Sequence, residues 1–403
     1  MNFKLALAAA AVVGLAGTAQ AADLAKKAPA AANYVKVCDA YGAGFFYIPG
    51  SDTCLKIGGF VRAEYRIHSG NKDGVGAANL WGNRLANGIG TRVRSDVNFD
   101  ARTNTEMGLL RSYIDFWMTV DSAQNGTISP SLRKAFVQFA GLTAGRATSF
   151  FDFYTGGTNS VFHMATPDAN VNLLAYTFSF GNGITASLSL EDSTTSDESP
   201  AVAPGVRRAY GSYAGVKTTD LVANVNVAQA WGSAQLMGVL HDDYGTSGGK
   251  LGYAVGAGVK VNLPMLAAGD QLALQAVYGK GALGYVFGSS RPTGAPAWVD
   301  FFDDGAGNIS QSSAWSIAAG LTHNWSKTLG STLAGSYASY DDYTAGSAFD
   351  FKQIDLQANL VWKPVAGLGI SGNVEYRYID NTAASGLKDG GAYVGFLRIQ
   401  RDF

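Results

Sequence analysis

The stretch "IGTRVRSDVNFDARTN" (Ile89–Asn104) alternates between two kinds of side chain. One set of alternate positions holds Ile89, Thr91, Val93, Ser95, Val97, Phe99 and Ala101. The other set holds Gly90, Arg92, Arg94, Asp96, Asn98, Asp100 and Arg102. Because successive side chains of a β-strand point to opposite faces, this stretch predicts a strand with one apolar-leaning face and one charged face. The surroundings of the strand decide which of the two faces meets water.

The chain begins with the features of an export signal. Lys4 supplies a positive start, Leu5–Gly17 is a short apolar core, and Ala19–Ala21 fits the small-x-small rule for cleavage. We therefore expect residues 1–21 to be a signal peptide and the mature chain to begin at Ala22. A membrane anchor is the weaker interpretation, because the apolar core is too short to span a bilayer.

Charge and hydropathy exclude two broad classes of protein. The chain has 30 basic and 31 acidic residues, and removal of Lys4 leaves 29 against 31. Because a nearly neutral chain creates no strong field, we expect no nucleic-acid partner. No run of about 18 apolar residues follows the signal, which argues against a helical membrane protein.

Two cysteines lie close together ahead of the first clear strand. Cys38 and Cys54 belong to an exported chain, so we predict that they form a disulfide in an oxidising compartment. Closing a loop of about 15 residues would stabilise the fold by roughly 3 kcal/mol. A metal site is the alternative, but no further Cys or His stands at ligand spacing.

The alternation of the opening stretch recurs along the chain. It is clear in residues 55–68, 352–363 and 369–380, and weaker in 184–191, 251–263, 272–278 and 315–325. Half-buried strands of a soluble sandwich also alternate. These runs, however, are about ten to fourteen residues long, close to what a tilted strand needs to cross a bilayer, and charges occupy the middle of their polar faces. We therefore predict an all-β, transmembrane antiparallel barrel with lipid outside and water inside.

The connections between the runs predict the number of strands. Seven short and eight long connections alternate, provided that residues 207–217 are counted inside a loop. Bacterial barrels alternate short periplasmic turns with longer outer loops, so this pattern gives 16 strands with both termini in the periplasm. We place the barrel at residues 54–403 and a periplasmic N-terminal segment at residues 22–53.

The C-terminus carries a signal of its own. Tyr393, Leu397, Ile399 and Phe403 alternate with polar residues, although Arg401 departs from the apolar pattern. The terminal aromatic of Phe403 resembles the signal that the outer-membrane assembly machinery reads.

Four motifs together resemble the porins of alphaproteobacterial outer membranes. They are "YVKVCDAYGAGFFYIPGSDTCLKIGG" (Tyr34–Gly59), "KAFVQFAGLTAGRATSFFDFY" (Lys134–Tyr154), "QAWGSAQ" (Gln229–Gln235) and "RIQRDF" (Arg398–Phe403). This resemblance implies a homotrimer of sixteen-stranded barrels in contact with the bilayer and with lipopolysaccharide. It also implies passive channels for small hydrophilic solutes, and a third outer loop, residues 147–171, that folds inward as a constriction.

The charged faces of the first strands supply the candidate pore-lining residues: Arg62, Arg66, Arg92, Arg94, Arg102 and Arg111, with the acids Glu64, Asp96, Asp100 and Asp115. One interpretation is a set of cross-strand ion pairs that stiffen and hydrate the wall. The other is an arginine wall that faces Asp152 and Asp168 on the inward loop, with Glu106 and Glu375 as further candidates, and sets ion preference. Both interpretations stay open at this point.

Three other functions remain as alternatives. The nearest is a porin selective for a sugar, an amino acid or a dicarboxylate; a closed structural or adhesive barrel is less favoured. An enzyme would need a nucleophile, a base and an orienting group at one site. The four histidines are scattered along the sequence, so we expect no catalytic site, no cofactor and no metal.

Overall fold

The structure is a computed structural model of the whole chain. It describes residues 36–69, 88–122, 126–156, 161–194, 213–288, 298–344 and 346–403. The predicted signal peptide, residues 1–21, and most of the first long connection lie outside the described residues.

Sixteen strands form the wall of the molecule. They are β2 (Cys54–Ser69), β3 (Ile89–Thr105), β4 (Gly108–Asp121), β5 (Ile128–Phe139), β6 (Leu142–Thr148), β7 (Asn170–Gly181), β8 (Ile184–Glu191), β9 (Asp220–Gln229), β10 (Gly232–Tyr244), β11 (Gly249–Asn262), β12 (Gln271–Lys280), β15 (Ser313–Asn324), β16 (Leu329–Asp341), β17 (Phe351–Val365), β18 (Leu368–Asn381) and β19 (Gly390–Asp402). A seventeenth strand of the same sheet, β1 (Phe46–Tyr47), pairs antiparallel with the first two residues of β2.

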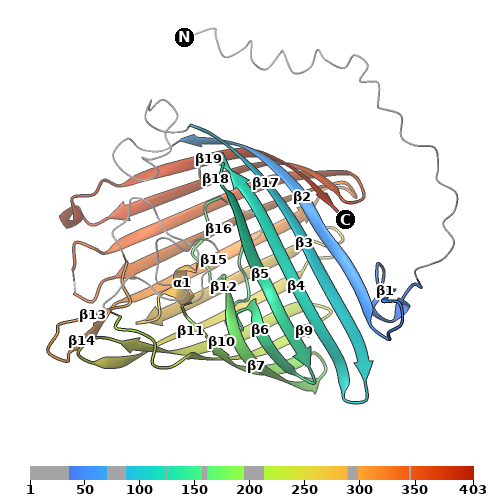
Figure 1. Cartoon of the computed structure of the whole chain (residues 1–403). Helices are drawn as coiled ribbons and strands as arrows, with labels where there is room; N and C mark the ends of the chain where they lie inside the picture. The colour runs from blue at the N-terminus through green and yellow to red at the C-terminus, as the bar shows by residue number, and fades with distance from the viewer. Residues whose placement is uncertain are drawn as a thin grey trace, which may run out of the picture.

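The sheet closes on itself. Each wall strand pairs antiparallel with the next one in the chain, and β19 pairs with β2, where Arg398 lies opposite Glu64. Figure 1 shows β2 beside β19 and all strands tilted in the same sense around the wall. A closed barrel leaves no unpaired edge, as a membrane requires. The predicted 16-stranded antiparallel barrel is therefore confirmed.

The two faces of the wall have opposite chemistry. On β2 the side chains of Ile57, Val61 and Tyr65 are exposed on the outside, while Arg62 and Glu64 are buried on the other face. The same alternation runs through the remaining strands, where exposed large side chains are mostly apolar. Apolar side chains outside and charged side chains inside are the reverse of a water-soluble fold and match a barrel in lipid.

The two ends of the barrel differ. Seven short turns, including Trp325–Thr328 and Ala366–Gly367, lie at the end that also holds the C-terminus; we call it the short-turn end. The opposite end carries the long connections and the small pair β13 (Phe301–Asp303) and β14 (Ile309–Gln311) (Figure 1).

The long connection predicted at residues 281–311 has more structure than the sequence suggested. It contains β13, β14 and the single helical turn α1 (Gly284–Phe287), all four residues of which are buried. Another long connection holds the 3₁₀ turn η3 (Ala383–Ser385). No helix among the described residues has the length and apolar character needed to cross a membrane.

The N-terminal residues fold against the short-turn end. The predicted Cys38–Cys54 disulfide is present and ties the 3₁₀ turn η1 (Asp39–Tyr41) to the start of β2. Phe45 packs against this disulfide. The C-terminal Phe403 exchanges two backbone hydrogen bonds with Gly59 of β2, so both ends of the described chain meet at the same seam.

Candidate functional site

A single carboxylate binds three guanidinium groups at the seam of the barrel. Glu64 of β2 lies directly opposite Arg92 of β3 and Arg398 of β19. The closest N–O distances from Glu64 are 2.6 Å to Arg66, 2.8 Å to Arg92 and 2.7 Å to Arg398. The Glu64 side chain is fully covered by these partners. We call these four residues the Glu64 cluster, and its formal charge is positive.

A second carboxylate organises the arginines nearer the short-turn end. Asp100 of β3 accepts hydrogen bonds from Arg102, at 2.7 and 3.0 Å, and from Arg111 of β4, at 2.9 and 3.0 Å. Arg66 also reaches Asp121 across the strands at 3.0 Å. The structure thus places four of the predicted arginines, Arg66, Arg92, Arg102 and Arg111, in ion pairs with acids.

The two other predicted arginines, Arg62 and Arg94, make contacts with aromatic rings and neutral polar side chains. The Arg94 guanidinium lies 4.0 Å from the ring centroid of Trp117 and donates to the Thr119 hydroxyl at 2.8 Å. Arg133, which the sequence had not singled out, lies 3.8 Å from the centroid of the same ring. Both guanidiniums thus lie in cation–π contact with the same indole ring.

Asp96 and Asp115 also lie among these groups. Asp96 accepts a hydrogen bond from the Trp117 indole at 2.9 Å and so orients the ring that both guanidiniums contact. Asp115 stands opposite Lys134 in the pairing of β4 with β5. Arg62 donates to Gln400 at 2.7 Å and lies 4.3 Å from the ring centroid of Phe60.

The segment between β6 and β7, of which residues 149–156 and 161–169 are described, makes contacts with much of the wall; we call it the 149–169 segment. Its start is held by Glu191 of β8, which accepts from the Ser149 hydroxyl at 2.6 Å and the Phe150 amide at 2.9 Å. Polar side chains of seven further strands bond its backbone: Asn224, Gln235, Lys260, Gln275, Ser336, Gln357, Glu375 and Arg377. Backbone groups without strand partners need such bonds when they are buried.

The aromatic side chains of this segment add to its attachment. Phe151 is fully buried and packs edge-to-face on Tyr285 of α1, with ring centroids 5.0 Å apart. The Lys260 ammonium lies 4.7 Å from the ring centroid of Phe153, and the Arg377 guanidinium lies 5.3 Å from that of Phe162. These contacts fix the segment through both apolar and cationic neighbours.

The candidate loop acids occupy different places. Asp152 accepts a hydrogen bond from the Ala169 amide at 2.7 Å and so links the two ends of the 149–169 segment. The backbone of Asp168 lies close to Gly288, just after α1. Glu106 is exposed in the β3–β4 turn. Glu375 accepts from the amides of Val161 and Phe162, so it anchors the segment.

Sequence reasoning missed several residues of this arrangement. Arg377, Arg398 and Gln357 stand on polar positions of clearly alternating strands, and that pattern is the only signal that pointed to them. Nothing local distinguishes them from other polar wall residues, because their partners lie far away in the sequence. Arg398, for example, is 334 residues from Glu64. Among the described residues, no group of three His, Cys, Asp or Glu side chains is placed to hold a metal ion.

Comparison of the sequence with known protein families identifies the family to which the chain belongs. The porin subfamily matches residues 23–395. The chain belongs to the porin subfamily. It is 31% identical to porin Omp2a of Brucella melitensis over 332 residues, covering 70% of this chain and 87% of the relative. It is 30% identical to porin Omp2b of Brucella suis over 327 residues, with the same coverage. The resemblance to alphaproteobacterial porins is therefore confirmed.

Solved structures share the fold of this porin. The outer membrane channel DcaP of Acinetobacter baumannii superimposes with a TM-score of 0.67 at 16% identity, covering 89% of this chain and 99% of the other. Salmonella typhi OmpF gives 0.55 at 12% identity, covering 88% and 99%. This chain is an outer-membrane channel porin, a barrel that crosses the membrane many times.

Proposed function

We propose that this porin forms a water-filled channel through which small hydrophilic solutes and ions diffuse passively. The observation that carries this proposal is the placement of arginines and carboxylates on the inner face of a closed barrel with an apolar exterior. Charged side chains need water or polar partners, so an inner face of this composition favours an aqueous bore.

The 149–169 segment narrows this bore, in our proposal. Its bonds go to inner-face side chains of β8, of β9 to β12 and of β16 to β18. Partners on so many strands favour a segment that crosses the lumen, and this is consistent with the constriction predicted at residues 147–171. The passage that remains lies beside β2 to β4, where the arginines stand.

The arginine wall sets the ion preference of the channel, in our proposal. At the seam, the guanidiniums of Arg66, Arg92 and Arg398 pair with Glu64. Arg62 and Arg94 stand opposite each other on β2 and β3 beside this cluster. Rings of charge in a pore attract ions of the opposite sign and repel those of the same sign. Cross-strand ion pairing and ion selection therefore use the same residues, and the two interpretations of the sequence are compatible.

The double variant Arg92→Ala/Arg94→Ala tests this role. Removing two positive charges from the wall is expected to move the reversal potential in a salt gradient towards cation preference. The measurement is the zero-current potential of single channels in a planar bilayer. The matched control is Lys388→Ala/Arg401→Ala, which removes the same charge from exposed positions. An unchanged reversal potential in the first variant would mean that Arg92 and Arg94 have only a structural role.

We infer the assembly and partners from the porin family. The barrel is a homotrimer in contact with the lipid bilayer and lipopolysaccharide, it is exported by residues 1–21, and the assembly machinery reads Phe403. Phe403 is 61% exposed, so its ring is accessible to that machinery.

A porin selective for one solute is the nearest rival proposal. Liposome swelling with sugars, amino acids and dicarboxylates separates it from a general channel, because only a selective porin passes one class much faster. A structural or adhesive barrel would give no conductance steps in a bilayer.

Among the described residues, one local arrangement favours an enzyme. His241 bonds Asp220 at 2.7 Å and the Tyr213 hydroxyl at 2.8 Å, in the order of a nucleophile, a base and an orienting acid. Because His241 and Asp220 are each only 1% exposed, this arrangement fits a structural link between outer loops better than a site for substrate.

A further inference from the structure

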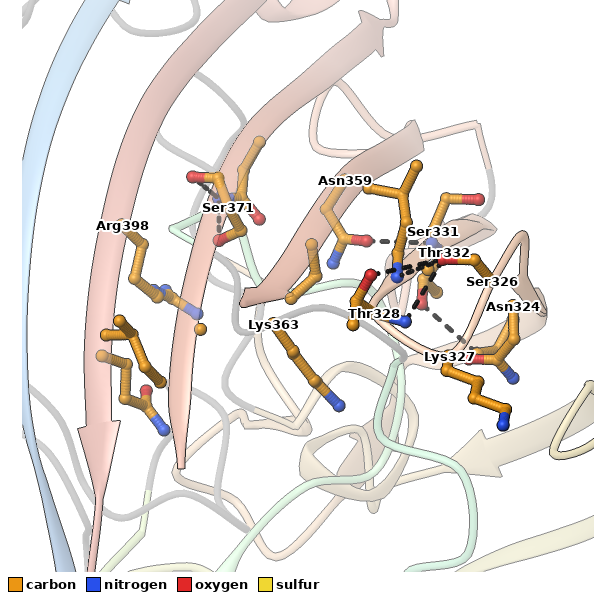
Figure 2. A pocket seen from close by; sticks show the side chains of 18 of the residues that line it. Asn324, Ser326, Lys327, Thr328, Ser331, Thr332, Asn359, Lys363, Ser371 and Arg398 are labelled. Carbon is orange, nitrogen blue, oxygen red and sulfur yellow. Dashed lines mark hydrogen bonds between the residues drawn. The ribbon is translucent and has the colours of Figure 1, made fainter. Parts of the chain in front are cut away.

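A polar cavity lies at the short-turn end of the barrel, away from the 149–169 segment. It has a volume of about 500 Å³ and is bounded by β15 to β19 and by the turns that join them. Figure 2 shows side chains from these strands and turns around it, including Lys327, Lys363 and Arg398. Its lining includes the inner-face residues Asn373 and Arg398, so we infer that a solute in the channel reaches it.

The charged groups that line this cavity are unbalanced. Three cations, Lys327, Lys363 and Arg398, face one acid, Asp402. Asp402 already accepts a hydrogen bond from Gln400 at 2.6 Å. Within the described part of the chain, neither lysine has a carboxylate at ion-pair distance. The cavity therefore presents two uncompensated ammonium groups.

A backbone hydrogen bond links the strand of one lysine to the turn of the other. Lys327 lies in the β15–β16 turn, and the amide of Lys363 donates to the carbonyl of Thr328 at 2.7 Å. The Ser326 hydroxyl accepts from the amides of Thr328 and Leu329, which fixes the turn. Because turn and strand are joined at this point, both lysines extend from the same part of the cavity lining.

The third cation connects the cavity to the Glu64 cluster. Arg398 shares Glu64 with Arg66 and Arg92, and Arg66 also pairs with Asp121, so two carboxylates face three guanidiniums. The potential at this side of the cavity is consequently positive as well. An anion that leaves the arginine wall meets further positive charge in the cavity.

The rest of the lining suits a hydroxylated ligand. It consists largely of hydroxyl and amide side chains: Thr322, Asn324, Ser326, Thr328, Ser331, Thr332, Asn359, Ser371, Asn373 and Gln400. Hydroxyl and amide groups both donate and accept hydrogen bonds, as the hydroxyl groups of a sugar do. No aromatic side chain lines the cavity, so recognition here is polar.

We propose that this cavity is a binding site for small hydroxylated anions, of the chemical class of sugar phosphates, in which Lys327 and Lys363 bind the anionic group. The inference deepens the proposed function, because it rests on the channel giving solutes access to the cavity. Lysine binds phosphate through charge-assisted hydrogen bonds, and the amides and hydroxyls hold the sugar.

Glucose 6-phosphate is the probe for this site. The full-length protein is reconstituted in a planar bilayer, and the reduction of its ion current is titrated with glucose 6-phosphate, glucose or inorganic phosphate. We expect glucose 6-phosphate to bind most tightly. The variant Lys327→Gln/Lys363→Gln should raise its dissociation constant about tenfold or more, because two charge-assisted contacts are lost.

The matched control is Lys250→Gln/Lys352→Gln. These lysines begin β11 and β17 at the opposite end of the barrel, and neither lines the cavity. Their loss changes the net charge equally and should leave the dissociation constant within about twofold. All four lysines are exposed, so both variants are expected to fold.

Three results would overturn the proposal: glucose binding as tightly as glucose 6-phosphate, inorganic phosphate binding as tightly, or equal losses in the two lysine variants. Absence of any conductance would instead contradict the proposed channel. Calorimetric titration of the detergent-solubilised trimer with the same three probes measures binding without conduction, so the two failures are told apart.

Discussion

At the scale of single residues, arginines outnumber their carboxylate partners in the ion-pair clusters of the inner wall. Glu64 satisfies three guanidiniums at once, and Asp100 satisfies two. Strand alternation predicted which residues share this face. It could not predict that Arg398 completes the Glu64 cluster, because this contact exists only when the last strand meets the first.

Glu64→Gln tests the Glu64 cluster. The substitution removes the charge that holds Arg66, Arg92 and Arg398 together and leaves them to repel one another. Removing one partner of a buried ion pair costs about 3–5 kcal/mol, and we expect about 3 because Arg66 keeps Asp121 as a second partner. The measurement is the urea midpoint of unfolding from lipid vesicles.

Glu106→Gln is the control for this variant, since Glu106 is exposed in a turn and its loss should change stability by less than about 0.5 kcal/mol. Equal stability of the two variants would mean that the Glu64 cluster contributes nothing to folding.

At the scale of elements, the short turns depend on backbone conformations that glycine provides. The turn between β7 and β8 runs through Gly181, Asn182 and Gly183, with φ values of 81°, 50° and 75°. The sequence predicted a turn there from these residue types. The structure adds that a Cβ on Gly183 would stand 1.9 Å from the carbonyl oxygen of Ala228 in β9, whereas one on Gly181 would meet nothing within 4 Å.

The pair Gly181→Ala and Gly183→Ala separates backbone strain from steric overlap. Both variants place a Cβ on a left-handed backbone, which costs roughly 1–2 kcal/mol. Only Gly183→Ala also overlaps a neighbouring strand, and we expect a further loss of about 1–3 kcal/mol. The free energy of unfolding in urea is measured for both variants. Equal losses of stability would show that β9 shifts away from the added Cβ without a cost in free energy.

At the scale of the whole molecule, closure of the barrel determines which face meets lipid. Val374 stands near the middle of β18 and is 60% exposed on the outer face, next to the buried Asn373 and Glu375 of the inner face. A polar backbone can cross hydrocarbon only when every strand is paired, and the β19–β2 pairing supplies the last partner.

Val374→Arg tests the lipid contact of this face. Arginine near the bilayer midplane of a barrel costs about 2–4 kcal/mol, so the free energy of folding into vesicles should fall by that amount. The control Val374→Leu keeps the apolar surface and should stay within about 1 kcal/mol of the wild type. A tolerated arginine would place this face in water.

The sequence by itself determined the barrel, the number of its strands and the inner position of the arginines, because a period of two and alternating connections are local properties of a chain. It also pointed to the Cys38–Cys54 disulfide, whose partners are close in sequence. Only the tertiary structure decided how the 149–169 segment is attached, which carboxylate joins which arginines, and that Lys327 and Lys363 share a cavity. These contacts depend on strand register and closure, which bring together residues whose separation along the chain carries no local signal.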